Sequence, residues 1–141
     1  MRQFRIGIRD IVSFLYASGD LSSETFQNVS ALEGTKAHQY IQSKYQSEDD
    51  TEVSINYIFE TKDLMLYLNG RIDGLLKDDN HWLIDEIKST RKNIYADDFT
   101  YQTEHLAQLK FYAYMYLKNN QIEYIKGQIT YVQISDYQTR Q

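Results

Sequence analysis

The chain has 141 residues, of which 42% are hydrophobic and 25% charged, and its 20 acidic and 15 basic side chains give a formal net charge of -5. The acidic balance argues against a broad basic surface of the kind that grips nucleic acid, and the absence of proline together with 20 aromatic residues suits a compact domain better than a disordered tail. Cysteine is absent, which excludes disulfides and thiolate metal clusters. No segment approaches the roughly 20 apolar residues of a membrane helix. We therefore expect one globular domain in the cytoplasm, with no membrane partner.

Two helices are predicted in the first third of the chain. The first has an apolar stripe at helical spacing, formed by Phe4, Ile8, Ile11 and Leu15. Gly19 is its expected stop signal. The second begins with a capping box at Ser30 and Glu33. Its inward stripe consists of Gly34, Ala37, His38, Ile41 and Tyr45.

The period of the apolar residues then changes to two, which is typical of strands. The predicted strands cover residues 53–59, 64–76 and 82–88, with turns at 61–63 and 77–80, and form an antiparallel meander. A helix is predicted over 101–117 and a last strand over 123–134. This order predicts an α/β fold in which a mixed β-sheet, the three-strand meander plus a further strand after a crossover helix, is flanked by α-helices.

Charged side chains interrupt the apolar second and third strands. Asp73 lies within Gly70-Arg71-Ile72-Asp73-Gly74, and the third strand contains Asp85, Glu86 and Lys88. Unpaired charges are costly to bury, so these side chains need a partner, and a divalent metal ion is a natural one. Because side chains alternate along a strand, Glu86 and Lys88 share one face. A hairpin can bring Asp73 alongside that face.

This arrangement predicts metal-assisted phosphodiester hydrolysis. Asp73 and Glu86 would hold Mg²⁺ or Mn²⁺ through oxygen ligands, with the carbonyl of Ile87 within reach of the same ion. Lys88 would orient or deprotonate the attacking water and offset charge on the phosphate. The alternative is a structural salt bridge from Lys88 to Asp73 or Glu86. Asp85 leaves the identity of the second acidic ligand open, and Glu86 is preferred because it shares the face of Lys88.

Two helices offer further candidates. A helix packed on the sheet would aim His38 at the metal ion, although a lone histidine on an apolar stripe is more often a core residue. In the helix over 101–117, one face carries His105, Gln108, Leu109, Tyr112 and Tyr116. Gln108 and Tyr112 lie one turn apart and are candidates to contact the backbone or bases of nucleic acid. The alternative is an amphipathic helix whose tyrosines fill the core.

The ordered motifs Gly34-x-x-x-His38, Gly70-x-x-Asp73, Glu86-x-Lys88 and Gln108-x-x-x-Tyr112 together resemble the RecB-type branch of the PD-(D/E)xK nuclease superfamily. The resemblance implies a restriction-endonuclease-like core. It also implies metal binding by His38, Asp73 and Glu86, and catalysis by Lys88. Gln108 and Tyr112 would assist substrate binding, and we group His105 with them. Many RecB-type nucleases carry a four-cysteine iron-sulfur cluster, which a chain without cysteine cannot hold.

Several segments resemble, more closely, the N-terminal nuclease-like domain of bacterial XPD/DinG-like DNA helicases. They are Ile8-Arg9-Asp10-Ile11-Val12, Ser18-Gly19-Asp20, Ala31-Leu32-Glu33-Gly34-Thr35 and Asp85-Glu86-Ile87-Lys88-Ser89-Thr90. This resemblance implies that residues 1–141 form a single nuclease-like domain at the N-terminus of a longer polypeptide. A downstream helicase domain would then supply ATP chemistry and much of the basic DNA track.

Three hypotheses follow for the function. The first is a metal-dependent DNA nuclease that cuts single strands or DNA ends beside a helicase in repair or recombination. The second is a catalytically silent module that keeps the fold to bind DNA or to brace the helicase. The third is an acidic metal-binding or scaffold domain whose tyrosine-rich faces pack against a partner. The complete motif set favours the first.

Overall fold

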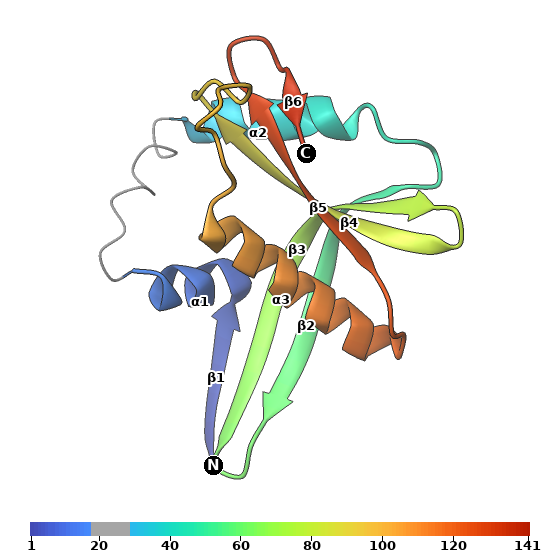
Figure 1. Cartoon of the computed structure of the whole chain (residues 1–141). Coiled ribbons are helices and arrows are strands. Elements are labelled where there is room, and N and C mark those ends of the chain that lie inside the picture. Colours follow the sequence, from blue (N-terminus) through green and yellow to red (C-terminus); the bar gives the residue numbers. More distant parts are fainter. Residues whose placement is uncertain (18–28) are drawn as a thin grey trace.

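The computed structural model describes residues 1–17 and 29–141 (Figure 1). In chain order, its elements are β1 (Arg2–Gly7), α1 (Ile8–Leu15), α2 (Ala31–Gln42), β2 (Asp50–Glu60), β3 (Leu64–Asp78), β4 (His81–Thr90), α3 (Thr103–Asn120), β5 (Lys126–Gln133) and β6 (Thr139–Arg140). The stop signal expected at Gly19 and the segment Ser18-Gly19-Asp20 lie outside the described residues. None of the helices described is both long and apolar enough to cross a membrane.

A single mixed sheet forms the centre of the fold. Its main path runs β1-β3-β4-β5-β6, and β2 pairs with the other edge of β3. β2, β3 and β4 form an antiparallel meander, and α3 carries the chain across to β5, which is parallel to β4. The predicted α/β fold class, with its meander, crossover helix and added strand, is therefore confirmed.

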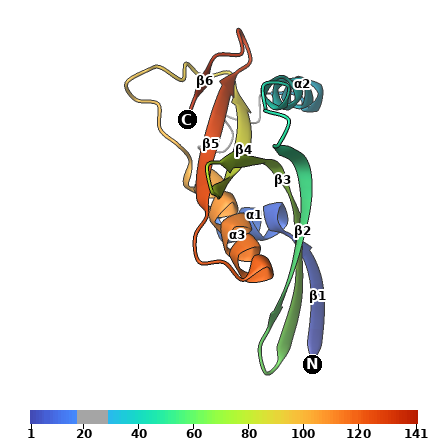
Figure 2. The same cartoon turned by 90° about the vertical axis from the view of Figure 1, so that its right-hand side faces the viewer.

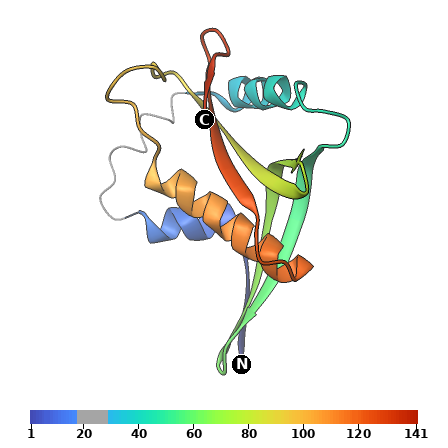
Figure 3. The same ribbon diagram turned by 45° about the vertical axis from the view of Figure 1, so that its right-hand side comes forward.

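Two hydrophobic cores lie on the two faces of β4. In Figures 2 and 3, α1 and α3 lie side by side, and α2 stands apart from them, beside β4 and β5. Ile84 belongs to the core of α1, α3, β2 and β3, whereas Ile87 packs with Ala37, Ile41 and Val132. An odd spacing along a strand places Ile84 and Ile87 on opposite faces. β4 is thus buried on both sides.

β3 is long enough to pair with two different strands along one edge. Its residues Leu64 to Asn69 pair with β1, and Gly74 to Asp78 pair with β4. Residues 70–73 lie between these two pairings, where β1 and β4 diverge (Figure 1). Tyr112 from α3 closes on this gap, because a Cβ built at Gly70 would lie 2.6 Å from its ring. The gap leaves one edge of β3 without a strand partner in the middle of the sheet.

The first predicted helix was partly wrong. Residues 2–7 form β1, and the helix covers only Ile8–Leu15. Phe4 and Leu15 are exposed, and Ile8 and Val12 are the buried side chains of α1. Sequence spacing missed this because parallel pairing with β3, a contact distant in the sequence, overrides local helical periodicity.

The remaining boundaries need smaller corrections. The capping box of α2 is confirmed, but the helix ends at Gln42, so Tyr45 lies beyond it. β3 extends into the predicted turn at 77–80, which shrinks to Asp79 and Asn80, and Asp79 adopts a positive φ of 54°. α3 continues to Asn120, and its C-cap residue, Gln121, has the left-handed backbone conformation. β1 and β6 are strands that the periodicity did not predict.

Candidate active site

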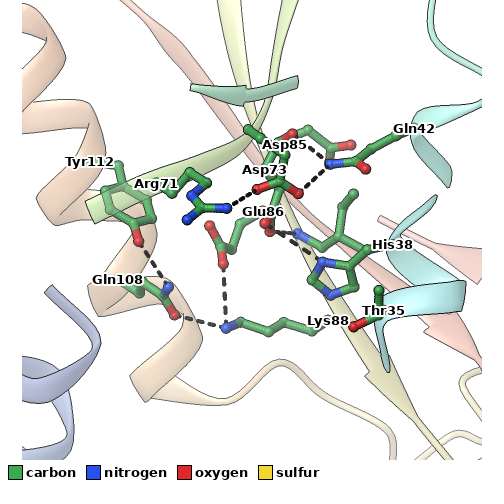
Figure 4. Close-up of polar contacts among 12 residues, drawn as sticks. Thr35, His38, Gln42, Arg71, Asp73, Asp85, Glu86, Lys88, Gln108 and Tyr112 are labelled. Atoms are coloured by element: carbon green, nitrogen blue, oxygen red, sulfur yellow. Dashed lines mark hydrogen bonds and ion pairs between the residues drawn. The ribbon is translucent and has the colours of Figure 1, made fainter. Parts of the chain in front are cut away.

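The gap in the sheet gathers charged and polar side chains from four elements (Figure 4). The structure brings together six of the side chains that the motifs predict, one from α2, one from β3, two from β4 and two from α3. They are His38, Asp73, Glu86, Lys88, Gln108 and Tyr112. These side chains thus meet where one edge of β3 lacks a strand partner, while its other edge stays paired with β2.

Asp73 replaces part of the missing strand pairing. Its Oδ2 accepts a hydrogen bond of 2.8 Å from the Ile87 backbone N–H, and its Oδ1 lies 3.6 Å from His38 Nδ1. Continuing the β3–β4 register by one residue places Asp73 opposite Glu86. Burial opposes ionisation of Asp73, but His38, the Ile87 N–H and the charge of Lys88 outweigh it, so the pKa of Asp73 lies below its usual value.

Glu86 is the buried acid without a donor. Its side chain is 1% exposed, and neither carboxylate oxygen accepts a hydrogen bond within the described part of the chain. Lys88 Nζ lies 3.3 Å from Oε1. Burial raises the pKa of Glu86 to about 8, against the attraction of Lys88, and the charge of Asp73 adds to the rise. A carboxylate in this environment is costly unless a cation compensates it.

A chain of polar contacts orients Lys88. Its Nζ donates to Gln108 Oε1 at 2.8 Å, and Gln108 Nε2 donates to the Tyr112 hydroxyl at 3.2 Å. Gln108 and Tyr112 are both buried. In this structure they contact each other and Lys88, and their contact with nucleic acid stays a prediction. The salt bridge considered as the alternative role of Lys88 is present, to Glu86.

His105 lies at the edge of the same region. Its Nδ1 is 2.8 Å from the Tyr131 hydroxyl, and it lines a cavity of about 300 Å³ together with His38 and Lys88. Burial, helped by the charge of Lys88, lowers the pKa of His105 to about 3. The ring is therefore neutral at physiological pH, and its predicted contact with nucleic acid would be a neutral hydrogen bond.

Asp85, next to Glu86 in the sequence, has a different environment. Its Oδ2 accepts from the Tyr45 hydroxyl at 2.5 Å, and its Oδ1 accepts from Thr130 at 2.5 Å and from Gln128 at 3.2 Å. Burial raises the pKa of Asp85, and these donors act against the rise. Neutral donors thus satisfy both oxygens, which favours Glu86 over Asp85 as the acid available to a metal ion.

The motifs missed two polar residues beside Asp73. Gln42 Nε2 donates to the Asp73 carbonyl and to Glu52 Oε1, each at 3.0 Å. Arg71 pairs with Glu52 at 3.6 Å. The spacing contained a signal for Gln42, because it follows His38 by four residues and therefore shares its helix face.

Comparison with known proteins agrees with this geometry. The family model of the PD-(D/E)XK nuclease superfamily matches residues 14–141. The chain belongs to this superfamily. Glu86-Ile87-Lys88 has the residue pattern (D/E)XK that the name of the superfamily contains, whereas Gly70-Arg71-Ile72-Asp73 contains no proline before the acid.

Among the curated proteins, none matches this chain. A solved structure described as "Crystal structure of SSO0001" has a TM-score of 0.66 and 22% sequence identity. The match covers 96% of this chain and 66% of that one. This likeness shows the fold, and it leaves about a third of the solved chain without a counterpart here.

Nucleases of this superfamily use divalent metal ions. Within residues 1–17 and 29–141, no group of three or more His, Asp or Glu side chains is arranged as a metal site. Mg²⁺ does not need such a cage, because it is usually held by one or two carboxylates while waters and substrate phosphates complete its shell. Asp73 and the donor-free Glu86 supply two carboxylates. The residues present therefore fit a divalent ion.

Proposed function

We propose that this chain is a metal-dependent deoxyribonuclease domain that hydrolyses phosphodiester bonds of single-stranded DNA or DNA ends with Mg²⁺ or Mn²⁺. Asp73 and Glu86 would hold the ion, with His38 and the Ile87 carbonyl as further ligands. When bound, the ion would lower the pKa of a water molecule and stabilise negative charge on the phosphate.

The observation that carries this proposal is the environment of Glu86. Apart from the Lys88 ammonium 3.3 Å from Oε1, neither of its oxygens has a polar partner in the described residues, although the side chain is 1% exposed. Folded proteins rarely leave a buried acid in this state unless it has a functional partner. The nearby Asp73 makes repulsion between the acids worse. A divalent cation between them would relieve both costs.

Lys88 is the proposed catalytic base or charge-stabilising group. Gln108 and Glu86 hold its Nζ from two sides, so the ammonium group occupies a defined position beside the acids. Preorganised charge of this kind stabilises a transition state without reorganisation during the reaction. Tyr112 and Gln108 act through Lys88 and are positioning residues.

The test is cleavage of end-labelled single-stranded and duplex DNA with Mg²⁺, Mn²⁺ or EDTA. We expect metal-dependent cutting that falls at least about 100-fold in Lys88→Ala and in Asp73→Ala. Lys77→Ala is a matched control, because Lys77 lies over the Trp82 ring on the same hairpin, away from the site. Equal activity of Lys88→Ala and Lys77→Ala would contradict the assignment of Lys88.

A second readout separates binding of the metal ion from catalysis. Thermal unfolding with increasing Mn²⁺ should raise the Tm of the parent chain and of Lys88→Ala, because both keep the carboxylates. Asp73→Ala and Glu86→Gln should lose this rise. A metal-dependent rise of equal size in all four proteins would show that the ion binds elsewhere.

We further propose that the domain belongs to a DNA helicase, as the resemblance of its segments implies. The net charge of -5 supports this, because a nuclease that lacks basic surface needs DNA binding from another part of the protein. The second candidate is a catalytically silent DNA-binding or bracing module, which the low positive charge also allows. If a longer protein that includes the helicase domain binds DNA and does not cut it, the silent module is supported.

A further inference from the structure

Two cavities flank the candidate site and divide its residues between them. The smaller, of about 300 Å³, is lined by Lys88, Gln108 and His38. The larger, of about 600 Å³, is lined by Asp73 and Tyr112. Among the described residues, Arg9 is the one that lines both. It therefore stands where the two cavities approach each other.

The backbone holds Arg9 firmly at this place. Gly7, the last residue of β1, pairs with Asn69, and Ile8 is 1% exposed in the core. Arg9 follows in the first turn of α1, so its Cα position is fixed on both the strand and the helix side. Only its side chain retains freedom to meet a ligand.

The guanidinium group of Arg9 is available. Arg71, the other arginine at the larger cavity, is already paired with Glu52. Arg9 makes neither a hydrogen bond nor an ion pair within the part of the chain that the structure describes. Its charge nevertheless reaches the site, because it acts to lower the pKa of both Glu86 and Tyr112. The guanidinium group of an unpaired arginine can donate two parallel hydrogen bonds, and this geometry suits a phosphate group.

We infer that Arg9 binds a backbone phosphate next to the scissile one, so that the substrate strand passes from one cavity to the other across the first turn of α1. The inference rests on the proposed nuclease function and adds a substrate-binding residue to it. Arg9 contributes affinity and register, and the acids and Lys88 carry the chemistry. An acidic domain makes few phosphate contacts, so the loss of one is readily measured.

The test measures binding of a single-stranded oligonucleotide by fluorescence anisotropy over a series of salt concentrations. Lys88→Ala protein with Ca²⁺ serves as the background, so that cleavage does not interfere. We expect Arg9→Ala to weaken binding about tenfold and to reduce the slope of log K against log salt by about 0.7. Arg9→Lys should restore the slope, because it keeps the charge, and part of the affinity.

Arg5→Ala is the matched control. It removes the same charge four residues away, where Arg5 lies over the Tyr67 ring and lines neither cavity. In the protein with Lys88 intact, Arg9→Ala should raise KM about tenfold and change kcat less than about threefold. Equal binding by the Arg9→Ala and Arg5→Ala proteins would overturn the inference while cleavage by the parent still supports the nuclease. A parent that neither binds nor cuts DNA would overturn both.

Discussion

Asp85 and Glu86 are adjacent acids on β4, but their carboxylates have different hydrogen-bond partners. Asp85 faces Tyr45, Thr130 and Gln128, which donate to both of its oxygens. Glu86 faces the gap in the sheet, where it has an ion pair with Lys88 and no hydrogen-bond donor among the described residues. Both side chains are about 1% exposed. Burial alone therefore does not distinguish a structural acid from a functional one.

The difference lies in the partners. Neutral donors that match the lone pairs of a carboxylate stabilise it within the fold and leave fewer lone pairs for a ligand. Glu86 has the Lys88 ammonium as its one polar partner among the described residues, which leaves most of its lone pairs open to a further cation. We propose that Asp85 serves stability, whereas Glu86 gives up stability for metal binding.

Glu86→Gln should remove cleavage, with a loss of at least about 100-fold, because the ion loses a charged ligand. Its free energy of unfolding without metal should rise or stay within about 1 kcal/mol of the parent, because the gain from removing a buried charge offsets the loss of the ion pair with Lys88. Urea denaturation and the DNA cleavage assay, run on the same preparation, measure the two effects. Glu86 would be structural if its loss destabilised the protein by several kcal/mol.

The pH dependence of stability should reveal the same acid. A carboxyl whose folded pKa is raised binds protons more tightly in the folded state, so its penalty is absent below about pH 4.5 and complete above about pH 8. In EDTA, the parent should therefore lose stability relative to Glu86→Gln as the pH rises through this window, by on the order of a few kcal/mol. Parallel curves for the two proteins would contradict the raised pKa.

Two glycines of β3 provide a matched pair. A Cβ at Gly70 would lie 2.6 Å from the Tyr112 ring, and one at Gly74 would lie 2.3 Å from the Tyr45 hydroxyl. Either alanine should destabilise the protein by about 1–3 kcal/mol through overpacking. Gly70→Ala should also reduce cleavage about tenfold or more, because it displaces the residue that holds Gln108 and, through it, Lys88. If Gly70→Ala and Gly74→Ala cleave DNA equally well under conditions in which both are folded, the two faces of β4 do not differ in function.

Tyr45→Phe removes only the hydroxyl group that donates to Asp85 and so tests the structural role of this acid. It leaves Asp85 Oδ2 without its donor, which should lower the free energy of unfolding by about 1–2 kcal/mol. Cleavage under folding conditions should change less than about threefold. Tyr40→Phe is a control, since Tyr40 is partly exposed on the neighbouring helix and packs against Tyr137. A loss of activity as large as in Lys88→Ala would place Asp85 in the catalytic machinery.

The sequence predicted the parts of the fold that local pattern controls. The capping box of α2, the strands of the meander and the crossover helix all follow from periodicity and turn residues, and the structure confirms them. β1 escaped prediction because its six residues become a strand only by pairing with Leu64 to Asn69, far along the chain. Phe4, Ile6 and Ile8 do alternate with Arg5 and Gly7, but this short alternation competes with the helical spacing of Phe4, Ile8 and Ile11.

For the site, the sequence determined which side chains are present and which of them share a strand face. The spacing of Glu86 and Lys88 places them together on any strand, because side chains alternate. Only the tertiary structure decided which acid stays free of donors, since that depends on Tyr45, Gln128 and Thr130, which come from distant parts of the chain. The gap that brings Asp73 to Glu86 also exists only in three dimensions, because it arises where β1 and β4 share one edge of β3.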